Sequence, residues 1–158
     1  MNILHIMRGL PGSGKSTTAR NLQLALSTAE KPVVLYATDD FWIRPNGMYD
    51  FNYDLIAPAH KWNQKRVELS MMDHVDHIIV DNVNTTWKEI IPYVKLAYIF
   101  SYMIQLHESD APWAMNVEEC YERTLHGVPY STILRMYHEW EPTDDIRKNI
   151  EQYEVENG

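Results

Sequence analysis

Apolar residues in this chain form short runs, which are separated by segments with apolar positions at helical spacing. Between the first two runs, Ala19, Leu22 and Leu26 recur at intervals of three and four, the spacing of one helix face. The second run is apolar without alternation, as expected for a parallel strand that is covered on both faces. The pattern predicts four strands, at residues 3–7, 33–37, 77–81 and 102–106.

Strands that alternate with helices are typical of a three-layer α/β fold. We therefore expect a parallel sheet of four or five strands with helices on both faces. Pro92 is expected to kink the helix that contains it. The acidic segment after Pro142 is expected to add one surface helix. The other helices after the second strand are predicted at residues 55–72, 86–100, 117–125 and 130–140.

Composition narrows the class of protein. Hydrophobic residues make up 45% of the 158 residues and charged residues 23%, as in average globular proteins, so we expect one folded domain. No apolar run is long enough to span a bilayer, and the first residues lack the pattern of a secretion signal. A cytoplasmic protein without a membrane partner is expected, in the host cytoplasm if it is viral. The single cysteine, Cys120, is expected to be a buried, unreactive thiol.

The net charge is distributed unevenly along the chain. Fourteen Lys and Arg against 22 Asp and Glu give a formal charge of −8. This charge excludes a protein whose whole surface is basic and binds nucleic acid, so any polynucleotide must bind in a local groove. Residues 1–29 contain Arg8, Lys15 and Arg20 but no acidic residue. The N-terminal segment is therefore the expected place for a phosphate group.

The sequence GLPGSGKS at residues 9–16 fits the phosphate-binding pattern G-x-x-x-x-G-K-[ST] in full. It lies between a predicted strand and a predicted helix, the context in which backbone N–H groups surround phosphate oxygens. Lys15 would reach the β and γ phosphates, and Ser16 would be a Mg²⁺ ligand. No guanine-reading Asn-Lys-x-Asp motif occurs, which favours ATP. The residues expected to bind the nucleotide are Gly9, Gly12, Ser13, Gly14, Lys15, Ser16 and Thr17.

Acidic residues follow two of the predicted strands. The carboxyl ends of parallel strands share one edge of the sheet, so Asp39 and Asp40 should face the same crevice as the phosphate-binding loop. A carboxylate there can accept the proton of an attacking hydroxyl, and we assign this role of general base to Asp39. Asp81 ends an apolar strand, where an acid holds Mg²⁺ in many P-loop proteins. The alternative is that these acids only cap the segments that follow.

Five ordered stretches together resemble the P-loop kinases of the phage polynucleotide kinase type, and most closely the compact group with a single polynucleotide-kinase-like domain. They read MRGLPGSGKST, TDDFW, AHKWN, IVDNVNTT and RTLHGVP. The resemblance extends to zeta-toxin-related P-loop kinases and to phage hydroxymethyluracil DNA kinases. It implies a kinase domain at residues 1–141 with a lid at about 117–129, followed by an acidic tail at 142–158.

The resemblance also implies roles for single residues. Asp39 matches the general base, and Arg123 matches a lid arginine that closes on the phosphates. The alternative for Arg123 is an exposed ion pair with Glu119, one helical turn earlier. Trp42 stands where the phage enzyme has a basic residue, with Arg44 two positions later, and His126 stands where more cationic side chains are expected.

The acceptor side is rich in aromatic residues, since seven of the 18 aromatics fall within residues 36–62. Aromatic faces stack on unpaired bases, and Phe41 and Trp42, beside the proposed base, are the best placed. At least half of these rings are expected to pack the segment onto the sheet instead. The residues expected to contact the acceptor are Asp40, Phe41, Trp42, Arg44, His60, Asn63 and Asn84.

Together these patterns predict an ATP- and Mg²⁺-dependent kinase that phosphorylates a hydroxyl group of a polynucleotide. The acceptor would be a single-stranded or flipped-out nucleotide, through its 5′-OH or through the hydroxymethyl group of a modified pyrimidine such as 5-hydroxymethyluracil in phage DNA. A kinase for nucleosides or other small molecules would use the same base position. A nucleotide-binding interaction module without catalysis would need the phosphate-binding loop but not Asp39.

Overall fold

A computed structural model describes residues 1–158 and shows a four-stranded sheet in which every strand pairing is parallel. The strand order is β2-β3-β1-β4, so that β1 and β3 are the central strands. This confirms the predicted α/β fold with four strands. The strands are β1 (Ile3–Arg8), β2 (Val33–Tyr36), β3 (His77–Asp81) and β4 (Met103–Glu108).

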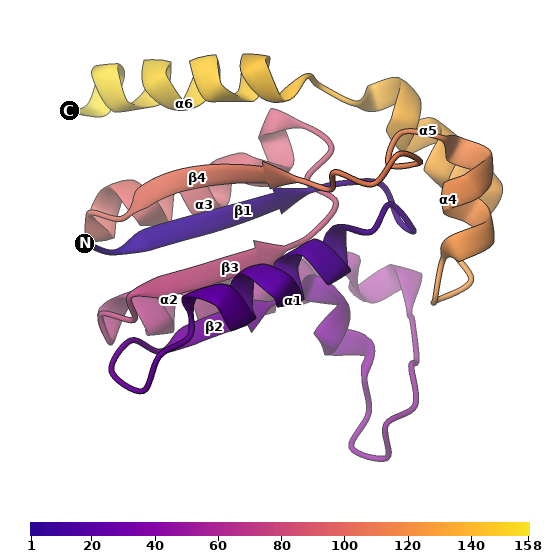
Figure 1. Ribbon diagram of the computed structural model, residues 1–158, viewed down its shortest axis with the longest axis horizontal. Helices are drawn as coiled ribbons and strands as arrows, with labels where there is room; N and C mark the ends of the chain where they lie inside the picture. The colour runs from indigo at the N-terminus through magenta and orange to yellow at the C-terminus, as the bar shows by residue number, and fades with distance from the viewer.

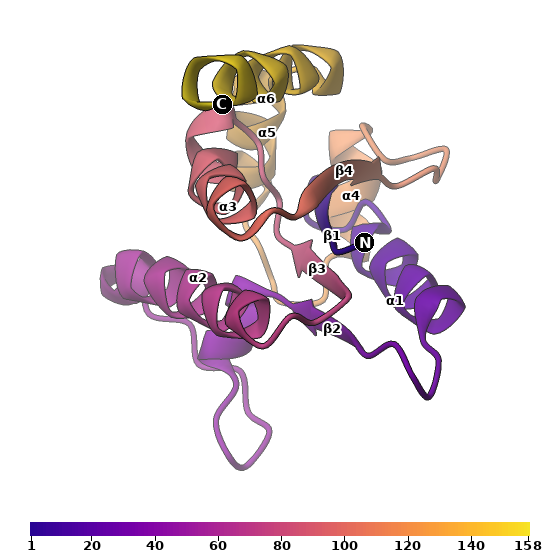
Figure 2. The ribbon, with the colours of Figure 1, turned by 90° about the vertical axis from the view of Figure 1, so that its left-hand side faces the viewer.

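The helices cover both faces of the sheet, as predicted. Figure 2 shows α1 on one face and α2 and α3 on the other, with α6 lying beyond α3. Two short 3₁₀ helices, η1 (Thr38–Trp42) and η2 (Tyr53–Leu55), flank the long excursion between β2 and α2. No helix is both long and apolar enough to cross a bilayer. The α-helices are α1 (Lys15–Leu26), α2 (Ile56–Met72), α3 (Trp87–Phe100), α4 (Val117–Arg123), α5 (Tyr130–Glu139) and α6 (Thr143–Asn157).

The main core lies between the sheet and the layer of α2 and α3. Leu4 and Ile6 of β1 and Ile78 and Val80 of β3 point to this side and are fully buried. A smaller cluster on the other face joins β1 and β3 to α1. Alternate residues of each strand therefore enter different cores, which explains why the central strands read as continuous apolar runs.

The acidic C-terminal segment forms a helix that contributes to the core. Ile146 and Ile150 of α6 are buried in the main cluster, although the rest of the helix is largely exposed. Arg8, at the end of β1, is fully buried, and its guanidinium donates to the carbonyl oxygens of Thr85 and Glu141 at 2.9 and 2.7 Å. This side chain ties the segment before α6 to the strand that leads into the phosphate-binding loop. Figure 1 shows the path of the chain through these elements.

Three histidines form a row across the face of the sheet that carries α1. His5 lies in the middle, with its ring nitrogens 2.9 Å from His107 and 3.0 Å from His77. Burial, together with the two neighbouring rings, lowers the pKa of His5 to about 4. Burial also lowers the pKa of His107. His5 and His107 are therefore neutral around pH 7.

Candidate active site

The phosphate-binding loop connects the buried end of β1 to the start of α1. Gly12 and Gly14 have φ of +79° and +90°, a backbone conformation that glycine adopts without strain. A Cβ atom on Gly12 would also overlap the carbonyl oxygen of Cys120 in α4. Cys120 is fully buried, as predicted, and burial raises the pKa of its thiol. The loop thus packs directly against α4, the first helix of the predicted lid.

The lysine predicted to reach the phosphates and the acid predicted to hold Mg²⁺ lie together. Lys15, at the start of α1, is 2.6 Å from the Asp81 carboxylate at the end of β3, and both side chains are largely buried. The pairing of β1 with β3 places Met7 beside Asp81, which brings the strand end next to the loop. The geometry gives a partly desolvated cation and an acid within one crevice.

The loop has the features that a triphosphate needs. No acidic residue lies in the first turn of α1 and no side chain caps it, so its N–H groups remain available to an anion. The Ser13 hydroxyl is buried without a hydrogen-bond partner, which leaves one donor free inside the loop. Ser16 and Thr17 lie in the first turn of α1. These groups fit the phosphates of ATP, and Ser16 with Asp81 fits a bound Mg²⁺.

Asp39 and Asp40 lie on η1, just beyond the end of β2, but their surroundings differ. The Asp40 carboxylate is 3.1 Å from the Arg66 guanidinium and accepts a hydrogen bond from the backbone of Ala37. Asp39 is exposed, has no cation within ion-pair distance, and lies near the hydroxyl of Tyr49. The chain therefore uses Asp40 to build η1 and leaves Asp39 open to a ligand.

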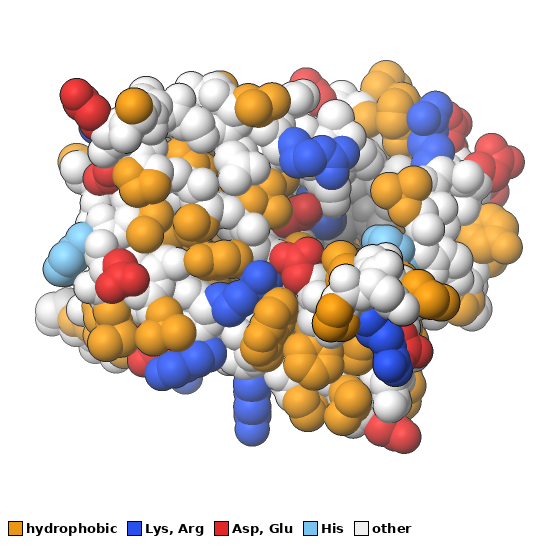
Figure 3. Space-filling model, turned by 90° about the horizontal axis from the view of Figure 1, so that it is seen from below, with side chains coloured by type: hydrophobic (Ala, Val, Ile, Leu, Met, Phe, Trp, Pro, Cys, Tyr) orange, Lys and Arg blue, Asp and Glu red, His pale blue; other side chains and the backbone are white.

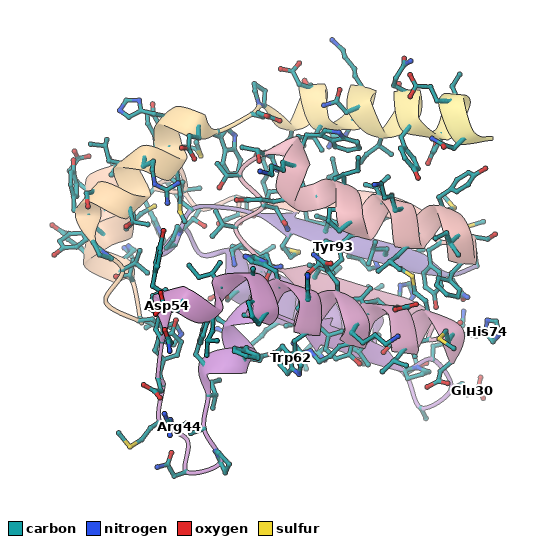
Figure 4. All side chains as sticks on the ribbon, turned by 180° about the vertical axis from the view of Figure 1, so that it is seen from behind. Glu30, Arg44, Asp54, Trp62, His74 and Tyr93 are labelled. Carbon is teal, nitrogen blue, oxygen red and sulfur yellow. The ribbon has the colours of Figure 1, made fainter.

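A polar network under η1 fixes its position, and the sequence did not indicate it. The backbone N–H of Thr38 donates to the Asn82 side chain at 2.9 Å, and the amide of Asn63 donates to the Tyr93 hydroxyl at 2.9 Å. Burial raises the pKa of Tyr93, which lies on α3 facing α2 (Figure 4). Arg66 completes the network by donating to Asn63 and to the Ala37 carbonyl. A buried tyrosine needs a polar partner, but the sequence does not say which.

Several predicted acceptor residues have structural roles instead. Asn63 is fully buried in the network, and Asn84, with φ of +52°, donates its buried amide to the Met7 carbonyl at 2.7 Å. Trp42 is buried between Phe41 and Phe51, edge to face with both rings. None of these three polar or aromatic groups is presented to a ligand. Their side chains satisfy internal contacts, which a one-dimensional motif cannot distinguish from substrate contacts.

The remaining acceptor candidates lie nearer the surface. Phe41 is half-buried, with its ring 5.5 Å from that of Trp62. His60 is half-buried in the first half of α2. Arg44 is exposed and pairs with Asp50, and Figure 4 shows it far from the sheet on the excursion. Phe41 follows Asp39 by two residues on η1, whereas Arg44 is held away on the excursion.

The predicted lid arginine lies on the helix that packs against the loop. The Arg123 guanidinium is 3.1 Å from Glu119, the ion pair considered as the alternative, and lies 3.6 Å from the ring centre of Trp113. Trp113 in turn donates its indole N–H to the carbonyl of Gly12 at 3.2 Å. Arg123 is thus joined to the phosphate-binding loop through Trp113, a residue that no sequence pattern singled out.

Seen from below, the surface is hollowed where these elements meet. Figure 3 shows acidic and basic side chains within this hollow and a histidine at its rim. The carboxyl ends of β1, β2 and β3 carry the phosphate-binding loop, η1 and Asp81, so all three open toward the same edge of the sheet. This is the edge at which open parallel sheets bind ligands.

Comparisons with known proteins agree with this architecture. Residues 4–142 match the family AAA_33, described as AAA domain. NEDD4-binding protein 2 of Homo sapiens is 38% identical over 134 residues, which are 85% of this chain but only 7% of that protein.

Two solved structures also resemble the chain. The first belongs to the Pnkp1/Rnl/Hen1 complex, with a TM-score of 0.58 at 24% identity over 82% of this chain and 42% of that chain. The second is the Mycobacterium tuberculosis APS kinase CysC in complex with AMPPNP and APS, with a TM-score of 0.55 at 18% identity, covering 80% and 70%. At these identities the likeness shows a shared fold. The family match and the fold agree, and the chain belongs to the AAA domain family AAA_33, with the fold of a P-loop kinase.

Proposed function

We propose that this protein is an ATP-dependent kinase that transfers the γ-phosphate to a hydroxyl group of a nucleic acid. The observation that carries the proposal is the position of Asp39. It is an exposed carboxylate without a cation partner, at the sheet edge that also holds the Lys15–Asp81 pair. A hydrolytic motor does not need a free carboxylate at that place, whereas a kinase needs one near its acceptor hydroxyl.

The proposed reaction uses the residues of this edge in separate roles. The acceptor oxygen forms a bond to the γ-phosphorus, the bond from that phosphorus to the bridging oxygen of ADP breaks, and the hydroxyl proton passes to Asp39. Lys15, the N–H groups of the loop and Arg123 hold the phosphates and stabilise the charge that develops on them. Ser16 and Asp81 would hold a bound Mg²⁺, which would neutralise phosphate charge.

A nucleic acid acceptor is supported by two features. The five sequence stretches resemble compact kinases of the phage polynucleotide kinase type, and the excursion beside Asp39 supplies aromatic rings for stacking. The 5′-OH of DNA or RNA is the first acceptor to test, and the hydroxymethyl group of a modified pyrimidine is the second. The formal charge of −8 favours a small-molecule acceptor instead, so nucleosides and sugars belong in the same assay.

The deciding experiment measures transfer of labelled γ-phosphate from ATP to 5′-OH oligonucleotides, hydroxymethyluracil DNA, nucleosides and small sugars. Asp39→Asn should lower kcat on the true acceptor about a hundredfold or more, with ATP affinity unchanged, because it removes the proton acceptor and keeps the shape. Asp73→Asn, at the exposed end of α2, is the control and should retain full activity.

Three results would contradict parts of this proposal. Transfer only to nucleosides or sugars would replace the nucleic acid acceptor. Near-normal turnover by Asp39→Asn would remove this residue from the chemistry. ATP binding without transfer to any acceptor, even in the wild type, would leave a nucleotide-binding module.

A further inference from the structure

The excursion between η1 and η2 contains a small hairpin that holds one tyrosine over the site. Ile43 and Tyr49 form an antiparallel bridge, and the N–H of Arg44 donates to the carbonyl of Met48 at 2.9 Å. The N–H of Gly47 closes the turn on Arg44 at 2.8 Å. Backbone hydrogen bonds therefore fix Tyr49 on the returning strand.

Tyr49 meets a ring from the opposite side of the cleft. The imidazole of His126, in the loop after α4, lies parallel to the phenol ring, with centroids 4.1 Å apart and planes inclined by 11°. The other aromatic pairs in the protein are tilted or edge to face. Figures 1 and 4 both show the loop after α4 extending toward the excursion. We call Tyr49 and His126 the ring pair.

The hydroxyl of Tyr49 occupies a position that matters to the proposed reaction. It lies near the carboxylate of Asp39, and burial, together with that negative charge, raises the pKa of Tyr49 to about 12. The hydroxyl therefore stays protonated at neutral pH and remains a donor. A hydroxyl group near Asp39 stands in the place that an acceptor hydroxyl must take.

We propose that the ring pair is the binding site for the flat base of the acceptor nucleotide, which enters between Tyr49 and His126 while its own hydroxyl replaces the tyrosine hydroxyl near Asp39. This proposal rests on the proposed kinase function and names the part of the acceptor that is recognised. Two parallel rings from separate elements can sandwich a planar group, and each ring face can stack on a base. Without an acceptor, the two rings stack on each other and keep the Tyr49 hydroxyl near Asp39.

The two rings of the ring pair can separate at low cost. Tyr49 is only half-buried and His126 is exposed, so separating them costs one ring contact and no core packing. A base in a duplex remains stacked on its neighbours and paired, and would have to leave the helix to enter. The site is therefore expected to select the terminal base of a single strand or a flipped base over a base within a duplex.

The test compares two single-stranded 5′-OH oligonucleotides that differ only in whether the terminal nucleotide carries a base. The wild type should show a kcat/KM at least about tenfold higher for the oligonucleotide with the base. Tyr49→Ala and His126→Ala should each reduce this ratio to within about threefold of one. Tyr49→Phe keeps the ring and should keep the ratio. Tyr53→Ala, which removes an exposed tyrosine of the same excursion, is the matched control and should also keep it.

A second measurement does not depend on turnover. A 5′-terminal 2-aminopurine should lose fluorescence on binding to the wild type and to Tyr49→Phe, because stacking quenches it, and should stay bright with Tyr49→Ala. Thermal stabilisation by ATP shows that each variant is folded. If the wild type does not distinguish the two oligonucleotides, or Tyr49→Ala still does, the ring pair is not the base site although the kinase proposal stands. If the wild type phosphorylates no oligonucleotide, the nucleic acid kinase proposal fails, and this inference fails with it.

Discussion

The two sides of the cleft are built in different ways. On the ATP side, Gly12 lies against the backbone of Cys120, and Lys15 and Asp81 form a largely buried pair. On the acceptor side, the hairpin is held by its own backbone bonds and by the exposed pair of Arg44 with Asp50, and it reaches the lid through one ring contact with His126. The ATP side is therefore built on buried contacts, whereas the acceptor side is built on contacts at the surface.

In the proposed reaction, this difference suits the separate requirements for binding ATP and for binding the acceptor. A phosphate site works best when its donors are fixed before binding, because no reorganisation is then needed when charge develops. An acceptor site on a surface hairpin opens at low cost, since little apolar area is buried there. Related proteins can then share one ATP site while the excursion and the lid adapt to different acceptors.

The largest difference between the two sides is expected when one methyl group is added to each. Gly12→Ala should remove ATP binding and lower the free energy of unfolding by at least about 3 kcal/mol, because the new Cβ overlaps the backbone of α4. Gly47→Ala, at the hairpin turn with φ of +83° and open space around it, should cost only about 1 kcal/mol. Denaturant unfolding and ATP titration measure both changes. Equal effects would contradict the distinction between the two sides.

Substitution of Arg8 measures how much the buried polar contacts on the ATP side contribute to stability. Arg8→Met should lower the free energy of unfolding by about 3 to 5 kcal/mol, because the carbonyl oxygens of Thr85 and Glu141 lose their donor inside the protein. Arg135→Met removes an exposed ion pair with Glu139 and should cost less than about 1 kcal/mol. Urea midpoints at constant slope give both values. A loss below 1 kcal/mol for Arg8→Met would show that α6 is held by its isoleucines alone.

His5, in the middle of the histidine row, makes the stability of the core depend on pH in the acidic range. The pKa of His5 falls from 6.5 to about 4 on folding, so the unfolded chain binds a proton that the folded protein rejects. The corresponding stability is complete above pH 6.5 and is lost as the pH falls toward 4, about 3 kcal/mol in total. Urea unfolding at several pH values should show this slope, and His5→Gln should flatten it. The exposed His138→Gln is the control, and an unchanged slope in His5→Gln would contradict the assignment.

The smallest expected effect concerns the lid arginine, where the two sides meet. Arg123→Ala should lower kcat about ten- to hundredfold, because a cation near the phosphates is lost. It should change the free energy of unfolding by less than about 1 kcal/mol, since the pair with Glu119 is exposed. Steady-state kinetics and urea unfolding separate the two effects. Unchanged kcat would indicate that Arg123 serves only to cover Trp113.

The sequence predicted most of the fold, because strands covered on both faces and helices with one apolar face leave distinct periodic patterns. The four strands and the helices appear where expected, to within a few residues. The acidic tail shows the limit of this approach. Its helix was expected on the surface, yet Ile146 and Ile150 enter the main core. Two isoleucines four residues apart mark an apolar face, but only packing shows what the face covers.

For the site, the sequence alone predicted the phosphate-binding loop and the acids at the strand ends, because the geometry of a parallel sheet places these residues at one edge. Lys15 and Asp81 lie together for that reason. The folded structure was needed to show that the side chains of Asn63 and Asn84 form hydrogen bonds inside the protein. It was also needed to show that Tyr49 lies near Asp39 and stacks on His126. Those contacts join residues ten or more positions apart, and the chemistry of a side chain does not specify a partner that the chain brings near only by folding.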